Sequence, residues 1–229
     1  MRILLTNDDG IHAPGLTALE RAAKQLGEVI VVAPAEHQSG ISHQVTAGQV
    51  ISVWEDAPSR FAVGGTPADC VRLGLTQLAR DVDWVFAGIN DGANLGVDIL
   101  MSGTVAAARE AALLGTPAIS WSQYVMRPDP VDWEAAIEML QMSWDRVEQL
   151  SLPKRAFWNV NFPHAPDVRR LAGPQLCSPE PQPLPVEYRP QDDGYFYCGR
   201  YAERPRSPGR DVDICFGGGI ALSKLTADA

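Results

Sequence analysis

The first 33 residues alternate between two apolar runs and a helical pattern, and this alternation constrains the fold more than any other part of the chain. Arg2–Thr6 is a short apolar run, and residues 28–33 (EVIVVA) form a second one that stops at Pro34. Between them, apolar residues recur at helical spacing over 16–26, and Gly27 follows. A strand, a helix and a second strand in this order predict a βαβ unit with parallel strands.

The same alternation continues through most of the chain. Further helical patterns cover 68–78, 104–114 and 132–150, and further buried strands are expected over 84–87, 117–121 and 156–161. Residues 45–53 alternate loosely, as exposed β structure does, and 195–201 and 220–225 are also expected to be strands. Strands that alternate with helices predict an α/β fold with a doubly wound, mostly parallel, Rossmann-like sheet.

The character of the chain changes after Pro163. Eight of the 18 prolines lie between positions 163 and 190, which leaves no room for a long helix. We therefore predict a single α/β domain over 1–229, in which 163–229 is a proline-rich and β-hairpin extension.

The composition excludes some partners. A formal net charge of -9 argues against binding to a nucleic-acid polymer, because such proteins neutralise phosphates with clustered Lys and Arg. The four cysteines are far apart without a CxxC pair and are expected to be reduced thiols. The apolar start of the chain stops at Thr6, too early for a signal peptide or a membrane span, so a cytoplasmic protein without membrane contact is expected.

Two adjacent carboxylates follow the first predicted strand, in the turn Asn7-Asp8-Asp9-Gly10. Ligands of such sheets bind at the carboxyl ends of the strands. Two neighbouring carboxylates that lose solvation in a crevice repel each other, and a hard divalent cation such as Mg²⁺ or Mn²⁺ relieves that repulsion. A solvated acidic turn is the alternative interpretation of the same residues.

Three later loops carry polar residues in comparable places. Ser39 lies between Gln38 and Gly40 on the loop after the second strand, where its hydroxyl can approach a metal or a phosphate. Asn90 lies in a glycine-rich loop, 88–96, and offers an amide oxygen as a further ligand. Residues 102–104 (SGT) open an alanine-rich helix, whose free N–H groups suit a phosphate dianion. An ordinary loop serine, a turn-rich connection and a simple helix cap are the respective alternatives.

These segments together resemble one protein family. The motifs NDDGIHAPG (7–15), QSGISHQVT (38–46), GTPADCV (65–71), GINDGANLG (88–96) and SGTVAAAREAALLG (102–115) are similar, in order and spacing, to those of the SurE (survival protein E) nucleotidases. The resemblance covers about the first 120 residues. The chain departs from the family pattern at Met101, where Tyr is common, and at Ala111, where Gly is common.

The resemblance implies a 5′(3′)-nucleotidase that hydrolyses nucleoside monophosphates with one divalent ion per subunit, Mg²⁺ or Mn²⁺. By position, Asp8, Asp9, Ser39 and Asn90 match the metal ligands, and Asn94, Ser102, Gly103 and Thr104 match the segments near the substrate phosphate. It also implies a homodimer or homotetramer that exchanges a C-terminal β-hairpin, so we expect 163–229 to serve in oligomerisation.

Several points of mechanism stay open at this stage. Asp8 and Asp9 are expected to act in catalysis together with a metal-bound water, with an aspartyl phosphate on one of them as the rival route. His12 and His43 are the candidates for the acid that protonates the leaving group. A non-catalytic nucleotide-binding protein, or a phosphatase of other small esters or short polyphosphate, are the alternative functions.

Overall fold

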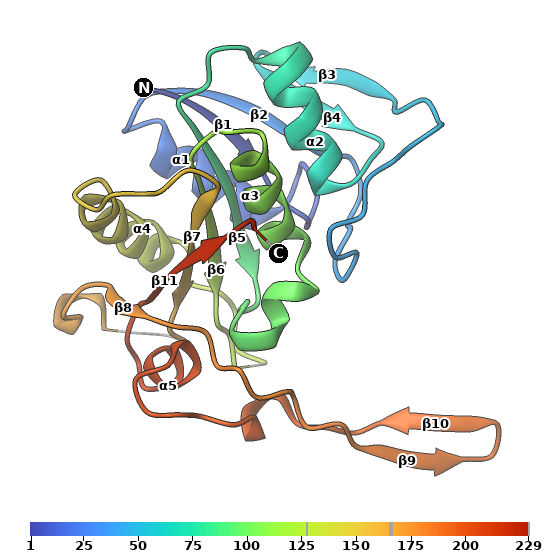
Figure 1. The fold of residues 1–229 in the computed structure, drawn as a ribbon, viewed down its shortest axis with the longest axis vertical. Helices are drawn as coiled ribbons and strands as arrows, with labels where there is room; N and C mark the ends of the chain where they lie inside the picture. Colours follow the sequence, from blue (N-terminus) through green and yellow to red (C-terminus); the bar gives the residue numbers. More distant parts are fainter. Residues whose placement is uncertain (127, 165–166, 229) are drawn as a thin grey trace.

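A mixed sheet runs through the protein, as the computed structural model in Figure 1 shows. Over the described residues, 1–126, 128–164 and 167–228, this sheet has nine strands. In sheet order they are β3 (Val53–Ala57), β4 (Arg60–Val63), β2 (Glu28–Pro34), β1 (Arg2–Thr6), β5 (Trp84–Asp91), β6 (Ala118–Gln123), β7 (Ala156–Phe162), β11 (Ala221–Thr226) and β8 (Gln175–Cys177).

The central strands are parallel, which confirms the predicted doubly wound α/β fold. All neighbours from β4 to β7 pair in parallel, whereas β3 and β11 pair antiparallel with β4 and β7. The chain winds from β1 toward β2 and β4 on one side, and later toward β5 and β6 on the other. The winding therefore reverses beside the carboxyl end of β1, where sheets of this type form their ligand crevice.

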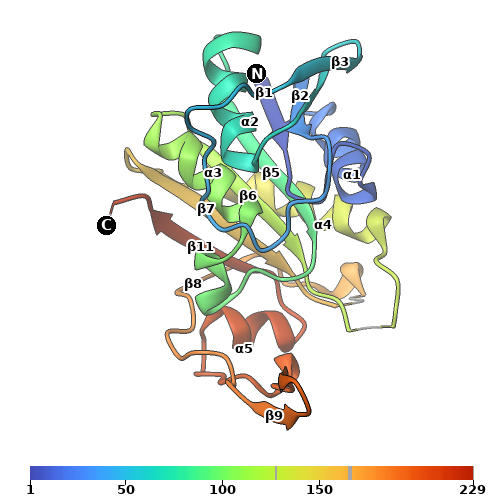
Figure 2. The ribbon, with the colours of Figure 1, turned by 90° about the vertical axis from the view of Figure 1, so that its right-hand side faces the viewer.

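Helices cover both faces of the sheet (Figures 1 and 2). The helices α1 (Pro14–Ala23) and α4 (Trp133–Val147) contact each other on one face, and α2 (Pro67–Leu73) and α3 (Gly103–Leu113) contact each other on the opposite face. Alternate residues of β1 face the two layers, because Ile3 and Leu5 belong to one buried cluster and Leu4 to the other. A wider helical turn, Gly74–Leu78, continues α2, in agreement with the predicted helix over 68–78.

The predicted exposed strand over 45–53 is wrong except at its last residue. The segment 45–52 forms no strand, and β3 begins at Val53. The Thr46 N–H and hydroxyl donate to the carboxylate of Asp69, and the Thr66 hydroxyl donates to the backbone oxygen of Gln44. Side chains of the first turn of α2 thus take the hydrogen bonds that a neighbouring strand would otherwise supply.

Part of the C-terminal region returns to the main sheet. Strands β8 and β11 join its edge, and a short helix that the sequence did not predict, α5 (Asp211–Phe216), packs against β11. The strand expected over 195–201 ends at Tyr197. Of the extension predicted over 163–229, positions 165–166 and 229 lie outside the described residues.

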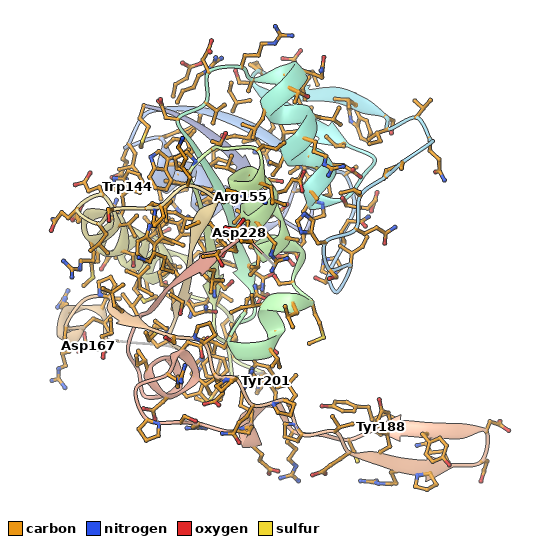
Figure 3. All side chains as sticks on the ribbon, viewed as in Figure 1. Trp144, Arg155, Asp167, Tyr188, Tyr201 and Asp228 are labelled. Atoms are coloured by element: carbon orange, nitrogen blue, oxygen red, sulfur yellow. The ribbon has the colours of Figure 1, made fainter. Side chains whose placement is uncertain are left out.

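A two-stranded hairpin projects away from the body of the molecule (Figure 1). It consists of β9 (Tyr188–Gln191) and β10 (Gly194–Tyr197), and Figure 3 shows Tyr188 on it and Tyr201 at its base. The base is anchored by Asp98, which accepts a hydrogen bond from the Tyr201 hydroxyl at 2.8 Å and pairs with Arg204 at 2.5 Å. Short 3-10 turns at Gly96–Leu100, Val168–Arg170 and Tyr201–Glu203 complete the chain path.

Two further expectations concern thiols and membranes. All four cysteines are free, as predicted from their spacing. Among the described residues, none of the helices has the length and apolar character needed to cross a bilayer.

Candidate active site

The turn after β1 lies where the winding of the sheet reverses. The Asn7 side chain donates to the backbone oxygen of Gly10 at 2.9 Å, and the Ala13 N–H donates to the same oxygen at 3.0 Å. Gly10 adopts φ +103°, a backbone conformation that side chains disfavour, so the turn needs glycine at this position. From this turn the Asp8 backbone oxygen meets the loop that follows β2, and the Asp9 carboxylate meets the end of β5.

Asp8 is buried against the start of α3. The Thr104 hydroxyl donates to its Oδ1 atom in a short hydrogen bond. A Cβ at Gly103 would lie 2.9 Å from the Asp8 Cβ, so only glycine lets the helix approach this closely. Burial raises the pKa of Asp8, and the hydrogen bond from Thr104 opposes that rise. The carboxylate therefore lies beside the partial positive charge of a helix N-terminus but carries its own charge with difficulty.

Asp9 is the more accessible of the two carboxylates, although its side chain is only 15% exposed. Its Oδ2 accepts a hydrogen bond from the Asp91 N–H at 3.3 Å, and its Oδ1 lies 3.6 Å from the Nδ1 atom of His37. Burial, and next the charge of Asp8, raise the pKa of Asp9 to about 6. Both acids resist ionisation in the absence of a cation, and a cation beside them would favour the ionised form of the pair.

The loop that carries Ser39 reaches the same place. The Gln38 N–H donates to the backbone oxygen of Asp8 at 2.7 Å, and Ser39 follows as an exposed residue. Asn90 lies near the end of β5, next to Asp91, and its Nδ2 donates to the Gly92 oxygen at 2.7 Å. This bond uses the amide nitrogen of Asn90 and leaves its oxygen as the atom suited to a metal.

The residues present fit a hard divalent cation. Within the described part of the chain, no group of three or more His, Cys, Asp or Glu side chains is arranged for a metal. An ion at Asp8 and Asp9 would therefore complete its shell with neutral oxygens, such as those of Ser39 and Asn90, and with water. An all-oxygen set of this kind suits Mg²⁺ or Mn²⁺ better than Zn²⁺ or copper.

The residues predicted to lie near the phosphate divide into two groups. Ser102 caps α3 by accepting a hydrogen bond from the Val105 N–H at 3.1 Å, beside the carboxylate of Asp8. Asn94 is buried farther along the sheet edge, where its side chain donates to the Ser122 hydroxyl at 2.8 Å and its N–H to Asn161 at 2.8 Å. The start of α3 thus meets Asp8, whereas Asn94 holds the 92–96 loop to β6 and β7.

The two histidines predicted as acid candidates have other carboxylate partners. His12 is 74% exposed and lies 3.6 Å from Asp56 of β3. His43 places Nε2 2.8 Å from Glu110 in the middle of α3, with Arg109 on its other ring nitrogen at 3.4 Å. The sequence analysis missed His37 beside Asp9, although its position two residues before Ser39 was a signal that this histidine shares the same loop.

Comparisons with known proteins agree with this fold. A profile of the family described as "Survival protein SurE" matches residues 3–182. A protein from Synechocystis is 45% identical over 98% of this chain and 99% of its own length, and the 5′-nucleotidase SurE of Paramagnetospirillum magneticum is 37% identical over 100% and 90%. The crystal structure of the SurE protein from Aquifex aeolicus superposes with a TM-score of 0.88 at 30% identity, over 100% of this chain and 94% of that one.

Proposed function

Since this chain belongs to the SurE family, we propose that it is a divalent-metal-dependent phosphatase that hydrolyses nucleoside 5′-monophosphates, and also 3′-monophosphates, to nucleoside and phosphate. The observation that carries this proposal is the carboxylate pair Asp8 and Asp9 at the point where the winding of the sheet reverses, with Asp8 buried against the first turn of α3. The names of the relatives support the substrate class, because several are called 5′-nucleotidase SurE.

We assign one divalent ion, Mg²⁺ or Mn²⁺, to Asp8, Asp9, Ser39 and Asn90. When bound, the ion supplies positive charge that offsets the charge of the phosphate and favours attack by water. Asp8 has little freedom to turn away, since Thr104 donates to it and Gly103 packs on it. The raised pKa values of Asp8 and Asp9 show that ionising both carboxyl groups costs free energy, and a bound cation would offset that cost.

The start of α3 is assigned to the phosphate. The first N–H groups of a helix lack partners within the helix, and together with the helix dipole they favour an anion. Ser102 keeps its hydroxyl at this point through the cap to Val105. Thr104 contributes by holding Asp8 rather than by touching the phosphate, because its hydroxyl already donates to the carboxylate.

The reaction forms a bond between a water oxygen and phosphorus and breaks the bond to the ribose oxygen, which must then gain a proton. We assign that proton to His37, whose ring lies beside Asp9, in place of His12 and His43. His37→Gln is expected to slow the hydrolysis of AMP more than that of p-nitrophenyl phosphate, whose leaving group needs no proton. Equal slowing of both substrates would contradict this role.

An aspartyl phosphate on Asp8 or Asp9 is the rival to direct attack by water. Acid quenching during turnover, followed by mass spectrometry, distinguishes the two. Direct attack predicts no phosphorylated aspartate, and a trapped phosphoaspartate would establish the rival route.

Phosphate release from a panel of substrates tests the function itself. The panel contains 5′- and 3′-monophosphates of several nucleosides, glycerol phosphate and short polyphosphate, each with Mn²⁺, with Mg²⁺ or with a chelator. We expect metal-dependent release from the nucleoside monophosphates. Tight nucleotide binding without release would instead identify a binding protein, and metal-independent release would contradict the assigned site.

A further inference from the structure

A cavity opens beside Asp9, on the side away from α3. Its volume is about 380 Å³, and Asp9 and Asp91 form its acidic wall. The remaining lining is mostly apolar and consists of Ala13, Pro14, Gly15, Pro130, Val131 and Trp133. The volume falls within the range of about 300 to 1,000 Å³ that is usual for small-molecule sites. The cavity therefore offers an apolar space in direct contact with the candidate active site.

Trp133 is held in a defined position in this cavity. It is the first residue of α4, and Asp132 caps that helix by accepting hydrogen bonds from the N–H groups of Glu134 and Ala135, both at 3.1 Å. A Cβ at Gly15 would lie 3.0 Å from the outer edge of the indole and 1.9 Å from the backbone oxygen of Ile89. Gly15 thus lets α1 approach both β5 and the half-buried indole, and this contact limits how far the ring can turn.

The charges of the lining indicate which part of a ligand enters. None of the described residues that line the cavity is Lys, Arg or His, and two of them are aspartates. Asp9 would repel a phosphate here, whereas a neutral group with O–H or N–H donors would meet a carboxylate acceptor and an aromatic ring. Asp9 belongs both to the cavity and to the carboxylate pair, so a single small ester can span the two places.

We propose that this cavity receives the nucleoside part of the substrate and that the Trp133 ring packs against its base. The proposal rests on the proposed function, because it assumes an ester whose phosphate lies at the start of α3. It makes Trp133 a determinant of the preference for nucleotides over small phosphate esters. Stacking on an aromatic side chain favours each type of base, so this contact selects the class of substrate rather than one base.

The test compares Trp133→Ala and Trp133→Phe with the wild type on AMP and on methyl phosphate, which has no base. We expect Trp133→Ala to lower the ratio of kcat/KM for AMP to that for methyl phosphate by roughly 5- to 100-fold, mainly through KM. Trp133→Phe is expected to retain most of the ratio, because its ring still stacks. Trp54→Ala is the matched control, since Trp54 is 48% exposed on β3, far from this cavity in the sheet order.

Two further measurements keep the result independent of folding and of turnover. Val131→Trp fills the cavity instead of enlarging it and is expected to lower the same ratio. Adenosine, which has no phosphate, is expected to bind the metal-loaded wild type by calorimetry and to bind Trp133→Ala at least 5-fold more weakly.

The outcomes separate this proposal from the proposed function. An unchanged ratio in both Trp133→Ala and Val131→Trp, with AMP still hydrolysed, would overturn the cavity proposal and leave the function intact. Adenosine binding that depends on Trp133, in a protein that releases no phosphate from any ester, would support the cavity and overturn the function.

Discussion

Gly103 has no side chain, and this allows Asp8 to lie against the first turn of α3. A methyl group there would stand 2.9 Å from the Asp8 Cβ and 3.0 Å from its Oδ2. Gly103→Ala must therefore displace the carboxylate or the helix. We expect kcat/KM for AMP to fall by about 10- to 1,000-fold and Mn²⁺ affinity to fall with it. Gly194→Ala in β10 is the control, because nothing lies within 4 Å of the added Cβ. A fully active Gly103→Ala variant would contradict the close packing at Asp8.

The raised pKa of Asp9 makes the stability of the metal-free protein depend on pH. The pKa rises from 3.8 in the unfolded chain to about 6 in the folded protein, so the folded state binds more protons between these values. The contribution of Asp9 to stability must then fall as pH rises from 4 to 6, by about 3 kcal/mol at most.

Asp9→Asn removes this pH-dependent loss of stability, because the amide side chain stays neutral. In chelator, we expect the variant and the wild type to unfold at similar urea concentrations at pH 4, and the variant to be the more stable at pH 7. Saturating Mn²⁺ is expected to reverse that order at pH 7. Parallel pH profiles of stability for the two proteins in chelator would contradict the raised pKa.

A functional residue can be identified from the sequence when its immediate neighbours along the chain indicate its role. Asp8 and Asp9 were identifiable because two carboxylates in a row follow a buried strand. Glu110 was not, because its role depends on its contact with His43, which is distant in sequence. The sequence places His37 on the Ser39 loop, but its contact with Asp9 is visible only in the structure. His43 was predicted to be an acid because its contact with Glu110 cannot be inferred from the sequence.

One buried carboxylate, Glu110, links the Ser39 loop to the body of the protein. It is 3% exposed in the middle of α3 and pairs with His43 at 2.8 Å and with Arg72 of α2 at 2.6 Å. The Ser42 N–H and hydroxyl also bind the backbone oxygens of Met101 and Leu100, at 3.1 and 2.7 Å. The loop is thus held to the start and to the middle of α3.

Glu110→Ala is expected to weaken this link. The free energy of unfolding should fall by about 1 to 3 kcal/mol, a discounted value because Arg72 is about half exposed. Mn²⁺ affinity should fall as well, since Ser39 loses its fixed position. Urea unfolding and calorimetry measure the two effects, and Glu138→Ala on α4 is the control. Unchanged stability and unchanged metal affinity would show that this link stabilises neither the fold nor the metal site.

Elements with a strong pattern of their own were predictable, and elements that depend on distant partners were not. The buried strands and the helices α1, α3 and α4 follow from apolar periodicity. Strand β4 and helix α5 are short, so their few residues carry too little periodicity. The predicted strand does not form over 45–52, where the Thr46 N–H donates to Asp69 and the preceding Gln44 oxygen accepts from Thr66.

The projecting hairpin is a feature of the whole molecule whose aromatic side chains the single chain leaves exposed. Tyr188, Tyr195 and Phe196 are 59%, 76% and 55% exposed on it, and exposed aromatic groups of this density mark contact surfaces. This supports the proposal that region 163–229 serves a homodimer or homotetramer. Replacing residues 188–197 with a short Gly-Ser linker is expected to give a folded monomer by light scattering. An unchanged oligomer, or a monomeric wild type, would contradict that use.

The central claim for the molecule is that one carboxylate pair at the reversal point of the sheet supports metal-dependent hydrolysis of nucleotides. The most direct measurement is kcat/KM for AMP as a function of Mn²⁺ concentration, for the wild type, for Asp8→Asn and for Asp145→Asn on the exposed side of α4. We predict saturable activation by Mn²⁺ in the wild type and in Asp145→Asn, and a loss of at least about 1,000-fold in Asp8→Asn. Wild-type activity in Asp8→Asn, or turnover that does not respond to Mn²⁺, would contradict the account.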